Sequence, residues 1–401
     1  MDRNTIIGFV LIVAILIGFQ IYTAPSAEER ARIQHEQDSL ANAQIAATEL
    51  RAKQVADSAL RAEQRLEAAI VPAGNDTLPD SLRLDTDSLE LARRLKSFGI
   101  FHPASTGSAK EVVLDNGKVQ VGINTHGARP GVIRLKDYTT YKGTPLLLAD
   151  PENGAYEYRF FLGTLDLSTK DLFFTVEKQD SLGVRLKAAT SEPGKHMVIT
   201  YRLDSTGYFL HTAVELNGLQ NEVDPGNLFF RWELLGLNNE KYLPAEQQKS
   251  SVYFKYVNDD RDYLSNTKDE EKDLNGRTNW VAFKQDFFSV AMVSDAGFAS
   301  SGSEIGITAM TDSVHNKRYL AKLAFEAEPA ANVSLPMRLY LGPNHYNTLR
   351  RTGIPQFDRI IDLGWGIFGW MNRFLVIPIF NFLGRFHLSY GIIILVLTIA
   401  I

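Results

Sequence analysis

Alternation of apolar and polar residues with a period of two runs from about Lys110 to Gly342. Turn residues interrupt it about every eight to twelve positions, which is typical of an all-β domain. The first β-hairpin is predicted as two strands that flank the turn Asp115–Lys118. Further strands are predicted at Met197–Leu203, Gly207–Leu216, Asn227–Leu235 and Tyr319–Glu328.

Roughly a dozen strands fit into this region by their spacing. Each would bury one face and leave the other in water, and such strands pack as two sheets face to face. The sequence therefore predicts one large β-sandwich over residues 106–350.

The N-terminal residues form an apolar segment, Ile6–Tyr22, behind a short polar head that carries the single basic residue Arg3. This pattern is typical of a membrane anchor or of a signal peptide. An uncleaved transmembrane anchor over residues 1–24 is the favoured interpretation, because no clear small-x-small cleavage motif closes the segment. Basic residues on the two sides leave its orientation open.

The last stretch, Ser389–Ile401, carries no charge. A helix needs about 20 apolar residues to cross a bilayer, and this stretch covers only about two thirds of that distance. We therefore expect residues 389–401 to begin a second transmembrane helix, cut short in a fragment of a longer membrane protein.

Residues 25–105 form a spacer between the anchor and the sandwich. Ser26–Ile70 is rich in Ala, Glu, Gln and Arg and lacks Gly and Pro, which favours a long solvated helix. Its apolar residues keep no strict heptad, so a spacer helix is favoured over a coiled coil. A short helix is expected to start near Asp87, with Glu90 completing a capping box.

The segment Gly364–His387 is dense in aromatic and branched residues but is interrupted by polar ones. It predicts an amphipathic interfacial helix within residues 351–388, with Pro378 as a local kink. An ordinary transmembrane helix is the alternative. The candidate membrane-interface anchors are Trp365, Trp370, Arg373 and Arg385.

Composition and motifs argue against several functions. With a net charge of -5 and a pI near 6.0, the chain lacks the excess of basic residues that is typical of nucleic-acid-binding proteins. The histidines lack the spacing of a metal site. The acidic stretch Asp259–Asp273 lacks the ligand spacing of a calcium-binding loop and is expected to be a solvated loop. We predict no catalytic, cofactor-binding or metal-binding residues. The histidines considered are His126, His196, His211, His315 and His345.

Three motifs and the order of parts resemble the YidC-type membrane protein insertases of diderm bacteria. Asn124–Tyr138 resembles a signature near the start of the family's sandwich. Trp280–Val293 resembles a pair of strands that carries a Trp and the motif Lys-Gln-x-Phe-Phe, and Leu339–Arg350 resembles the Gly-Pro motif at the end of the sandwich. The segment that precedes the family's conserved membrane core is similar to two stretches of this chain, LGWGIFGW and HLSYGIIILVLTI. The signature residues are Gly127, Tyr138, Trp280, Lys284, Phe287, Phe288, Gly342 and Pro343.

The resemblance implies a protein of the bacterial inner membrane, multi-pass at full length, with its large domain in the periplasm. Implied partners are nascent inner-membrane proteins, the Sec translocon with its accessory subunits, the lipid bilayer, and the ribosome only through regions outside this chain. The implied activity is insertion and folding of membrane proteins, without enzymatic chemistry or cofactors. The family's groove cation, which attracts acidic client segments, would fall just after Ile401.

The resemblance also implies that the sandwich is a supersandwich of the galactose-mutarotase type. That leaves an alternative open by fold analogy, namely a membrane-anchored sandwich that binds or processes carbohydrate at the cell envelope. The two hypotheses differ in the chain expected beyond Ile401. An insertase needs several more spans there, whereas the alternative needs at most a short completion of the last helix.

Overall fold

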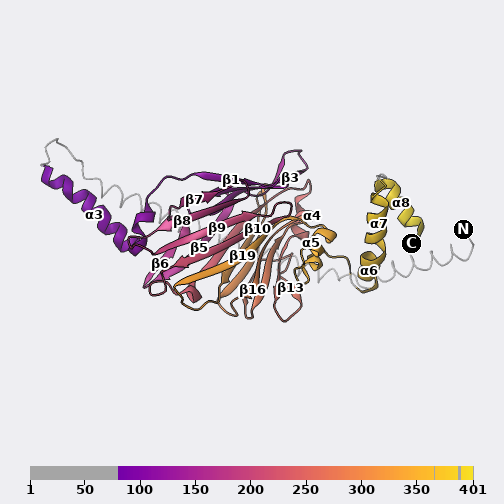
Figure 1. Cartoon of the computed structure of the whole chain (residues 1–401). Helices are drawn as coiled ribbons and strands as arrows, with labels where there is room; N and C mark the ends of the chain where they lie inside the picture. The colour runs from indigo at the N-terminus through magenta and orange to yellow at the C-terminus, as the bar shows by residue number, and fades with distance from the viewer. Residues whose placement is uncertain (1–79, 365, 387–389, 401) are drawn as a thin grey trace, which may run out of the picture. The chain divides into compact units, whose positions relative to one another are not determined.

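Strands dominate the part of the chain that the computed structural model describes, which comprises residues 80–364, 366–386 and 390–400 (Figure 1). Residues from Ser81 onward belong to one compact unit. The predicted N-terminal anchor and most of the predicted spacer lie outside the described residues and stay predictions.

All strand pairs are antiparallel, and they form three sheets. The four-stranded sheet has the order β1 (Glu111–Asp115), β2 (Val119–Asn124), β3 (Arg129–Thr139), β4 (Pro145–Ala149). The nine-stranded sheet has the order β13 (Arg261–Tyr263), β12 (Ser251–Tyr256), β15 (Thr278–Lys284), β16 (Phe288–Phe298), β19 (Asn332–Pro343), β10 (Phe209–Asn217), β9 (His196–Leu203), β8 (Gly183–Ala189), β7 (Thr175–Gln179). The six-stranded sheet has the order β14 (Glu270–Leu274), β17 (Ser303–Ala309), β18 (His315–Ala324), β11 (Phe229–Leu237), β5 (Gly154–Leu162), β6 (Leu165–Ser168).

Helices are few among the described residues. Short ones connect some of the strands, and a group of them comes after the last strand. Their bounds are α3 (Asp80–Phe98), η1 (Gly99–Ser105), η2 (Thr169–Asp171), η3 (Pro225–Asn227), α4 (Leu243–Lys249), α5 (Tyr346–Arg351), η4 (Phe357–Ile360), α6 (Gly366–Met371), the π-helical turn η5 (Asn372–Val376), α7 (Ile377–Gly384) and α8 (Tyr390–Ala400).

The core of the sandwich follows from the period of two. In β11, Phe230, Trp232 and Leu234 are buried, whereas the residues between them are partly exposed. One continuous cluster of buried side chains draws members from all three sheets. Aromatic contacts join the two larger sheets directly, since Phe283 of β15 lies 6.1 Å from Trp232 and 5.4 Å from Tyr319 between ring centroids. The predicted β-sandwich is confirmed, but it contains three sheets rather than the expected two, because β1 to β4 form a sheet of their own.

Three details of the sequence prediction are wrong. The described residues contain 19 strands rather than about a dozen, because short ones such as β13 and the wholly exposed β7 show no apolar alternation. The stretch Asp259–Asp273 is not one loop, since β13 and the first part of β14 fall within it. Helix α3 starts at Asp80, so Asp87 lies inside the helix and does not cap it.

Two glycines, one at the start of β5 and one in the turn between β5 and β6, test how tightly the strands of the six-stranded sheet approach. Both have a positive φ, +114° at Gly154 and +59° at Gly163. A Cβ on Gly154 would lie 1.8 Å from the backbone oxygen of Glu233, whereas one on Gly163 would meet nothing within 4 Å.

We expect Gly154→Ala to lower the free energy of unfolding by about 3 kcal/mol or more, because backbone strain and overpacking add. Gly163→Ala should cost only about 1 kcal/mol, from backbone strain alone. Urea unfolding of the detergent-solubilised chain, followed by circular dichroism of the sheets, measures both. Equal costs would show that β5 and β11 do not approach each other so closely.

Candidate functional site

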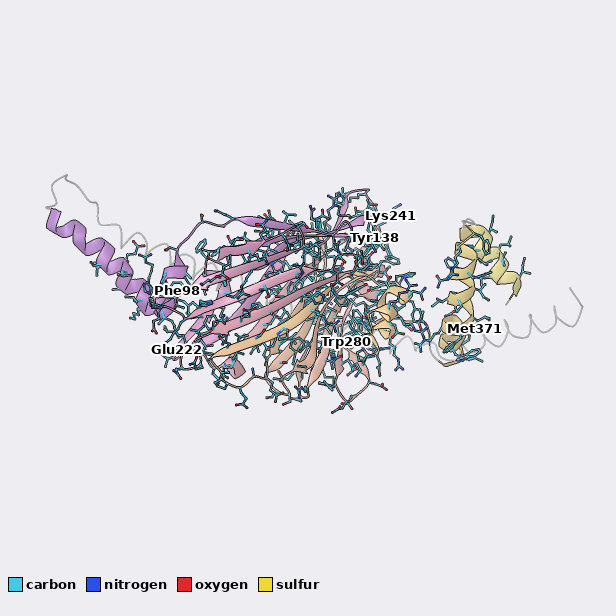
Figure 2. All side chains as sticks on the ribbon, viewed as in Figure 1. Phe98, Tyr138, Glu222, Lys241, Trp280 and Met371 are labelled. Atoms are coloured by element: carbon cyan, nitrogen blue, oxygen red, sulfur yellow. The ribbon has the colours of Figure 1, made fainter. Side chains whose placement is uncertain are left out.

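Six of the signature residues meet where β15 turns into β16 and where β19 ends. Phe288 pairs with Pro343 and Ser289 pairs with Gly342 across the two strands. The ring of Tyr138, at the end of the sandwich opposite Glu222 in Figure 2, stands edge-on to Phe288 at 5.1 Å. Phe287 is exposed at the turn, with 54% of its surface in solvent. Lys284, the last residue of β15, completes this group, so the signature residues largely mark one end of the sandwich.

Gly342 is there because no other residue fits. Its Cβ position lies 2.8 Å from Cγ of Tyr208 and 2.9 Å from Oη of Tyr340. That same tyrosine hydroxyl donates a 2.7 Å hydrogen bond to the carbonyl of Pro343. At the end of β19, Gly342 therefore leaves room for the buried Tyr340, and Pro343 accepts its hydrogen bond. The Gly-Pro pair has a structural role.

Gly127 belongs to a different place, the turn that leads into β3. It has a φ of +84°, and Ala128 after it also has a positive φ of 44°. Its N–H donates 2.8 Å to the carbonyl of Leu172. Glycine is required because this left-handed conformation favours a residue without a Cβ.

Two buried lysines hold the end of α4. Lys284, only 8% exposed, donates a 2.6 Å hydrogen bond from Nζ to the carbonyl of Lys249. Nζ of Lys317 donates to the carbonyls of Ser250, at 3.0 Å, and Asn266, at 2.7 Å. Cations at the C-terminal end of a helix satisfy its free carbonyls. Burial lowers the pKa of both Lys284 and Lys317 to about 8.

A buried carboxylate holds the other side of the same helix. Glu246 of α4 is 1% exposed and accepts hydrogen bonds from the backbone N–H groups of Asn239 and Glu240, at 3.2 and 3.3 Å, and from Nδ2 of Asn316, at 3.2 Å. Burial raises the pKa of Glu246. Gln285, next to Lys284, accepts from Asn316 at 3.3 Å and so extends the network. Sequence analysis missed this network, because its members are scattered and only their burial brings them together.

A second hydrophobic cluster covers the outer face of the nine-stranded sheet. The segment 346–361, which we call the strap, runs over this face after β19 and contributes four buried side chains. They pack on outward-facing residues of β15, β16 and β19. The buried members are Trp280, Ala282, Ala291, Val293, Tyr340, Leu349, Ile354, Phe357 and Ile360.

Trp280, labelled in Figure 2, is the largest side chain of this second cluster and is fully buried. Its indole Nε1–H donates a 2.9 Å hydrogen bond to the carbonyl of Pro355, and its ring packs edge-on against Phe357 at 5.4 Å. The strap is pinned a second time by Gln356, whose side-chain oxygen accepts from the backbone N–H of Arg261 at 3.0 Å. Trp280 therefore fixes the chain that leads to the membrane-proximal helices.

The membrane-proximal helix runs from Gly366 to Gly384 and is long and apolar enough to cross a membrane by length and composition. None of its side chains is buried, and several are largely exposed, among them Ile367 at 73% and Trp370 at 61%. The helix is irregular just before Pro378, at the π-helical turn η5, in which the N–H of Ile377 bonds to the carbonyl of Asn372. Pro378 itself lies at the start of α7, and the kink expected there stays a prediction. The interfacial placement stays a prediction.

The candidate interface anchors are only partly brought together. Trp365 lies outside the described residues. Trp370 and Arg373 lie near the start of the helix and both line one groove, whereas Arg385 follows α7 and is exposed. Their role as membrane anchors stays a prediction.

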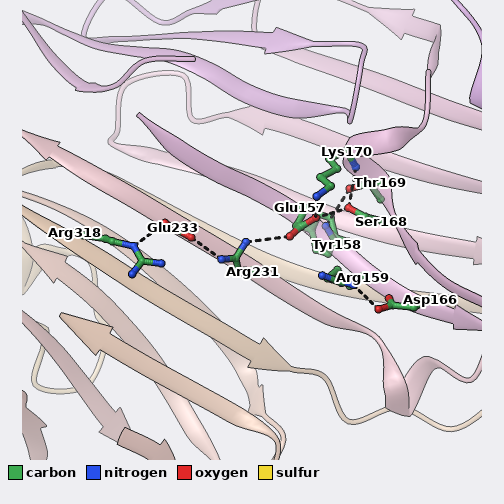
Figure 3. A network of polar contacts seen from close by, with 10 residues as sticks. All are labelled: Glu157, Tyr158, Arg159, Asp166, Ser168, Thr169, Lys170, Arg231, Glu233 and Arg318. Carbon is green, nitrogen blue, oxygen red and sulfur yellow. Dashed lines mark hydrogen bonds and ion pairs between the residues drawn. The ribbon is translucent and has the colours of Figure 1, made fainter. Parts of the chain in front are cut away.

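The outer face of the six-stranded sheet carries a charged ladder formed by Glu157, Arg231, Glu233 and Arg318 (Figure 3). Arg231 bridges Glu157 at 3.3 Å and Glu233 at 2.5 Å, and Arg318 binds Glu233 at 2.7 Å. Glu157 is almost fully buried and also accepts a hydrogen bond from Ser168. Each carboxylate of the ladder is already neutralised by a cation, so the ladder presents no free acid for general acid or base chemistry.

The histidines lie in different parts of the sandwich, and each contacts a different neighbour. His126 stacks on Phe173 at 4.2 Å, His211 contacts Asp204 at 2.8 Å, and His315 contacts Asp312 at 3.1 Å. Within the described ranges, no group of three or more His, Cys, Asp or Glu side chains could hold a metal ion.

Fold and site define a large β-sandwich that is tied by a strap to an apolar helix. A family model described as the YidC periplasmic domain matches residues 111–380. Proteins named membrane protein insertase YidC match the whole chain, at 32% identity in Parabacteroides distasonis and at 30% in Phocaeicola vulgatus and in Porphyromonas gingivalis. The chain spans 61–62% of the length of these relatives.

The chain belongs to the YidC family of membrane protein insertases, so the resemblance seen in the sequence is confirmed. As a member, it is a protein of the bacterial inner membrane with a periplasmic domain. Relatives are named as insertases and not as enzymes.

Two solved structures are similar in shape at low sequence identity. YidC from Thermotoga maritima matches with a TM-score of 0.34 at 11% identity, over 74% of this chain and 68% of that one. A galactose mutarotase-like protein from Lactobacillus casei matches with a TM-score of 0.39 at 12% identity, over 58% of this chain and 100% of that one.

Replacing Trp280 tests the strap. We expect Trp280→Phe to lower the free energy of unfolding by about 2–3 kcal/mol, because it leaves the Pro355 carbonyl unpaired and opens a small cavity. Trp370→Phe, a matched change at an exposed site, should stay within about 0.5 kcal/mol of the parent. Urea midpoints give both values, and equal effects would contradict the role of Trp280.

The buried lysines predict a pH dependence. The folded pKa of Lys284 is about 8, below the ordinary 10.5, so between these values the unfolded state binds more protons and stability rises with pH. From pH 7.5 to 9.5 we expect a gain of roughly 1–2 kcal/mol from each of Lys284 and Lys317. Lys284→Met should remove about half of the rise in urea midpoint. A rise that is unchanged in this variant would show that Lys284 is not buried as a cation.

Proposed function

We propose that the full-length protein inserts and folds inner-membrane proteins, alone or together with the Sec translocase, and that this chain supplies its periplasmic domain and the membrane elements next to it. Support comes from the family match over residues 111–380 together with the apolar helix that comes after the strap. Nascent membrane proteins and the lipid bilayer are the partners that the family's named activity requires.

We further propose that the protein works without covalent chemistry or a cofactor. The buried charged groups of the sandwich support this, because their partners belong to the fold itself. Lys284 and Lys317 bind backbone carbonyls, and Glu246 binds backbone N–H groups. The carboxylates of the charged ladder are neutralised by arginines. The task that remains for the domain is to bind and to position.

The finer proposal is that the sandwich contacts the Sec translocon and client segments outside the membrane. The strap supports it, because it is packed on the sandwich almost up to the start of the membrane-proximal helix, and a short link of this kind can hold a partner near the membrane. A freely hinged domain could not do so.

Complementation tests the insertase function. Expression of the full-length protein in cells depleted of their own insertase should restore insertion of a small single-span client, read by protease protection from the periplasmic side. The same protein with residues 366–384 deleted serves as the control and should fail. Absence of rescue by a full-length protein that reaches the membrane would contradict the proposal.

Deleting residues 110–340 from the full-length protein tests the role of the sandwich. We expect recovery of Sec subunits in pull-downs to fall strongly, while insertion of small Sec-independent clients falls much less. The physical reason is that the sandwich is proposed as the Sec contact and the membrane helices as the insertion machinery. Equal loss of both activities would contradict this division.

A further inference from the structure

We propose that a groove where the strap ends and α6 begins binds a phosphate group, and that the headgroup of an anionic phospholipid is its source. We call it the arginine groove, and its volume is about 370 Å³. It lies within the single compact unit that starts at Ser81. Its charged and aromatic lining residues are Arg261, Arg359, Arg373, Asp362, Trp370 and Phe374.

The first cation comes from the edge strand β13. The guanidinium carbon of Arg261 lies 5.3 Å from the ring of Tyr253 and 5.7 Å from the ring of Tyr263. These two rings stack on each other at 5.2 Å. Among the described residues no carboxylate pairs with Arg261, and its Nε is buried without a hydrogen-bond partner. The aromatic rings therefore hold this charge in place and leave it uncompensated.

The second cation comes from the membrane-proximal helix. Arg373 lies in the π-helical turn η5, and its Nε is also buried without a partner. No carboxylate of the described residues forms an ion pair with it. Two guanidinium groups from elements far apart in the sequence thus line one groove with their charges unpaired.

The remaining charges leave the groove positive. Arg359 meets only Asp260, at 3.7 Å, and both side chains are exposed, so this pair contributes little. The single acid in the lining is Asp362, and its Oδ1 already accepts the N–H of Gly364 at 2.9 Å. Three arginines and one aspartate give 3 − 1 = +2.

The residues that line the groove favour a phosphate group that is attached to a lipid. Guanidinium groups match the oxygens of a phosphate in a planar, bidentate way. Trp370 and Phe374, 61% and 58% exposed, form an apolar wall beside them. Tryptophan at a membrane surface sits at headgroup depth. Inorganic phosphate would use the arginines alone, whereas a phospholipid also covers the aromatic wall.

Calorimetric titration of the purified full chain in detergent tests this inference. The ligands are dihexanoyl phosphatidylglycerol, dihexanoyl phosphatidylcholine and inorganic phosphate. We expect the phosphatidylglycerol to bind most tightly, because it combines a net negative charge with acyl chains. Arg261→Gln/Arg373→Gln should raise its Kd about 25-fold, fivefold for each arginine near a membrane surface.

Arg350→Gln/Arg351→Gln is the matched control, since it removes the same two charges from exposed positions of α5 outside the groove, and its Kd should change less than about threefold. Arg261→Lys/Arg373→Lys keeps the charge but loses the planar fork, and should give an intermediate Kd. The urea midpoint of each variant verifies that the sandwich stays folded.

Equal weakening by Arg350→Gln/Arg351→Gln and by Arg261→Gln/Arg373→Gln would overturn the groove as a site and leave only general electrostatic attraction. Binding of inorganic phosphate as tight as that of phosphatidylglycerol would overturn the lipid as the source. No measurable binding of any of the three ligands would overturn the whole inference. The titration involves no client protein, so a failure here leaves the proposed insertase function standing.

Discussion

The hydrogen bond from Trp280 to the carbonyl of Pro355 is the interaction on which the connection between the sandwich and the membrane depends. A buried indole N–H needs an acceptor, and here the acceptor belongs to the strap and not to the sheet. The bond and the packing of Phe357 on the same ring turn a connecting segment into part of the fold. Everything after residue 361 then starts from a fixed point.

The buried charges serve the same purpose on a smaller scale. Lys284 and Lys317 bind carbonyls at the end of α4, and Glu246 binds N–H groups before its start. A buried ion is costly unless such partners satisfy it. These contacts fix a seven-residue helix that would be unstable alone, and they stiffen the end of the sandwich that carries the signature residues.

Sequence alone predicted the sandwich because the middle of strands such as β11 alternates polar and apolar residues, with Trp232 inward and Arg231 outward. It could not predict short edge strands such as β13, where three residues show no period. The strap was missed although a signal existed, since Trp280, Val281 and Ala282 form a continuous apolar run of the kind found in strands buried on both faces. The arginine groove had no such signal, because Arg261 and Arg373 are more than a hundred positions apart.

The central claim is that the strap belongs to the fold of the sandwich. Hydrogen exchange of the full chain in detergent, resolved by mass spectrometry, tests it most directly at the amides of Phe357, Arg359 and Ile361, whose hydrogen bonds close the 3₁₀ turn. We expect these amides to be protected nearly as well as those of β15, and to lose protection in Trp280→Phe. Exchange within seconds in the parent protein would show that residues 346–361 are a free linker, and would contradict the account.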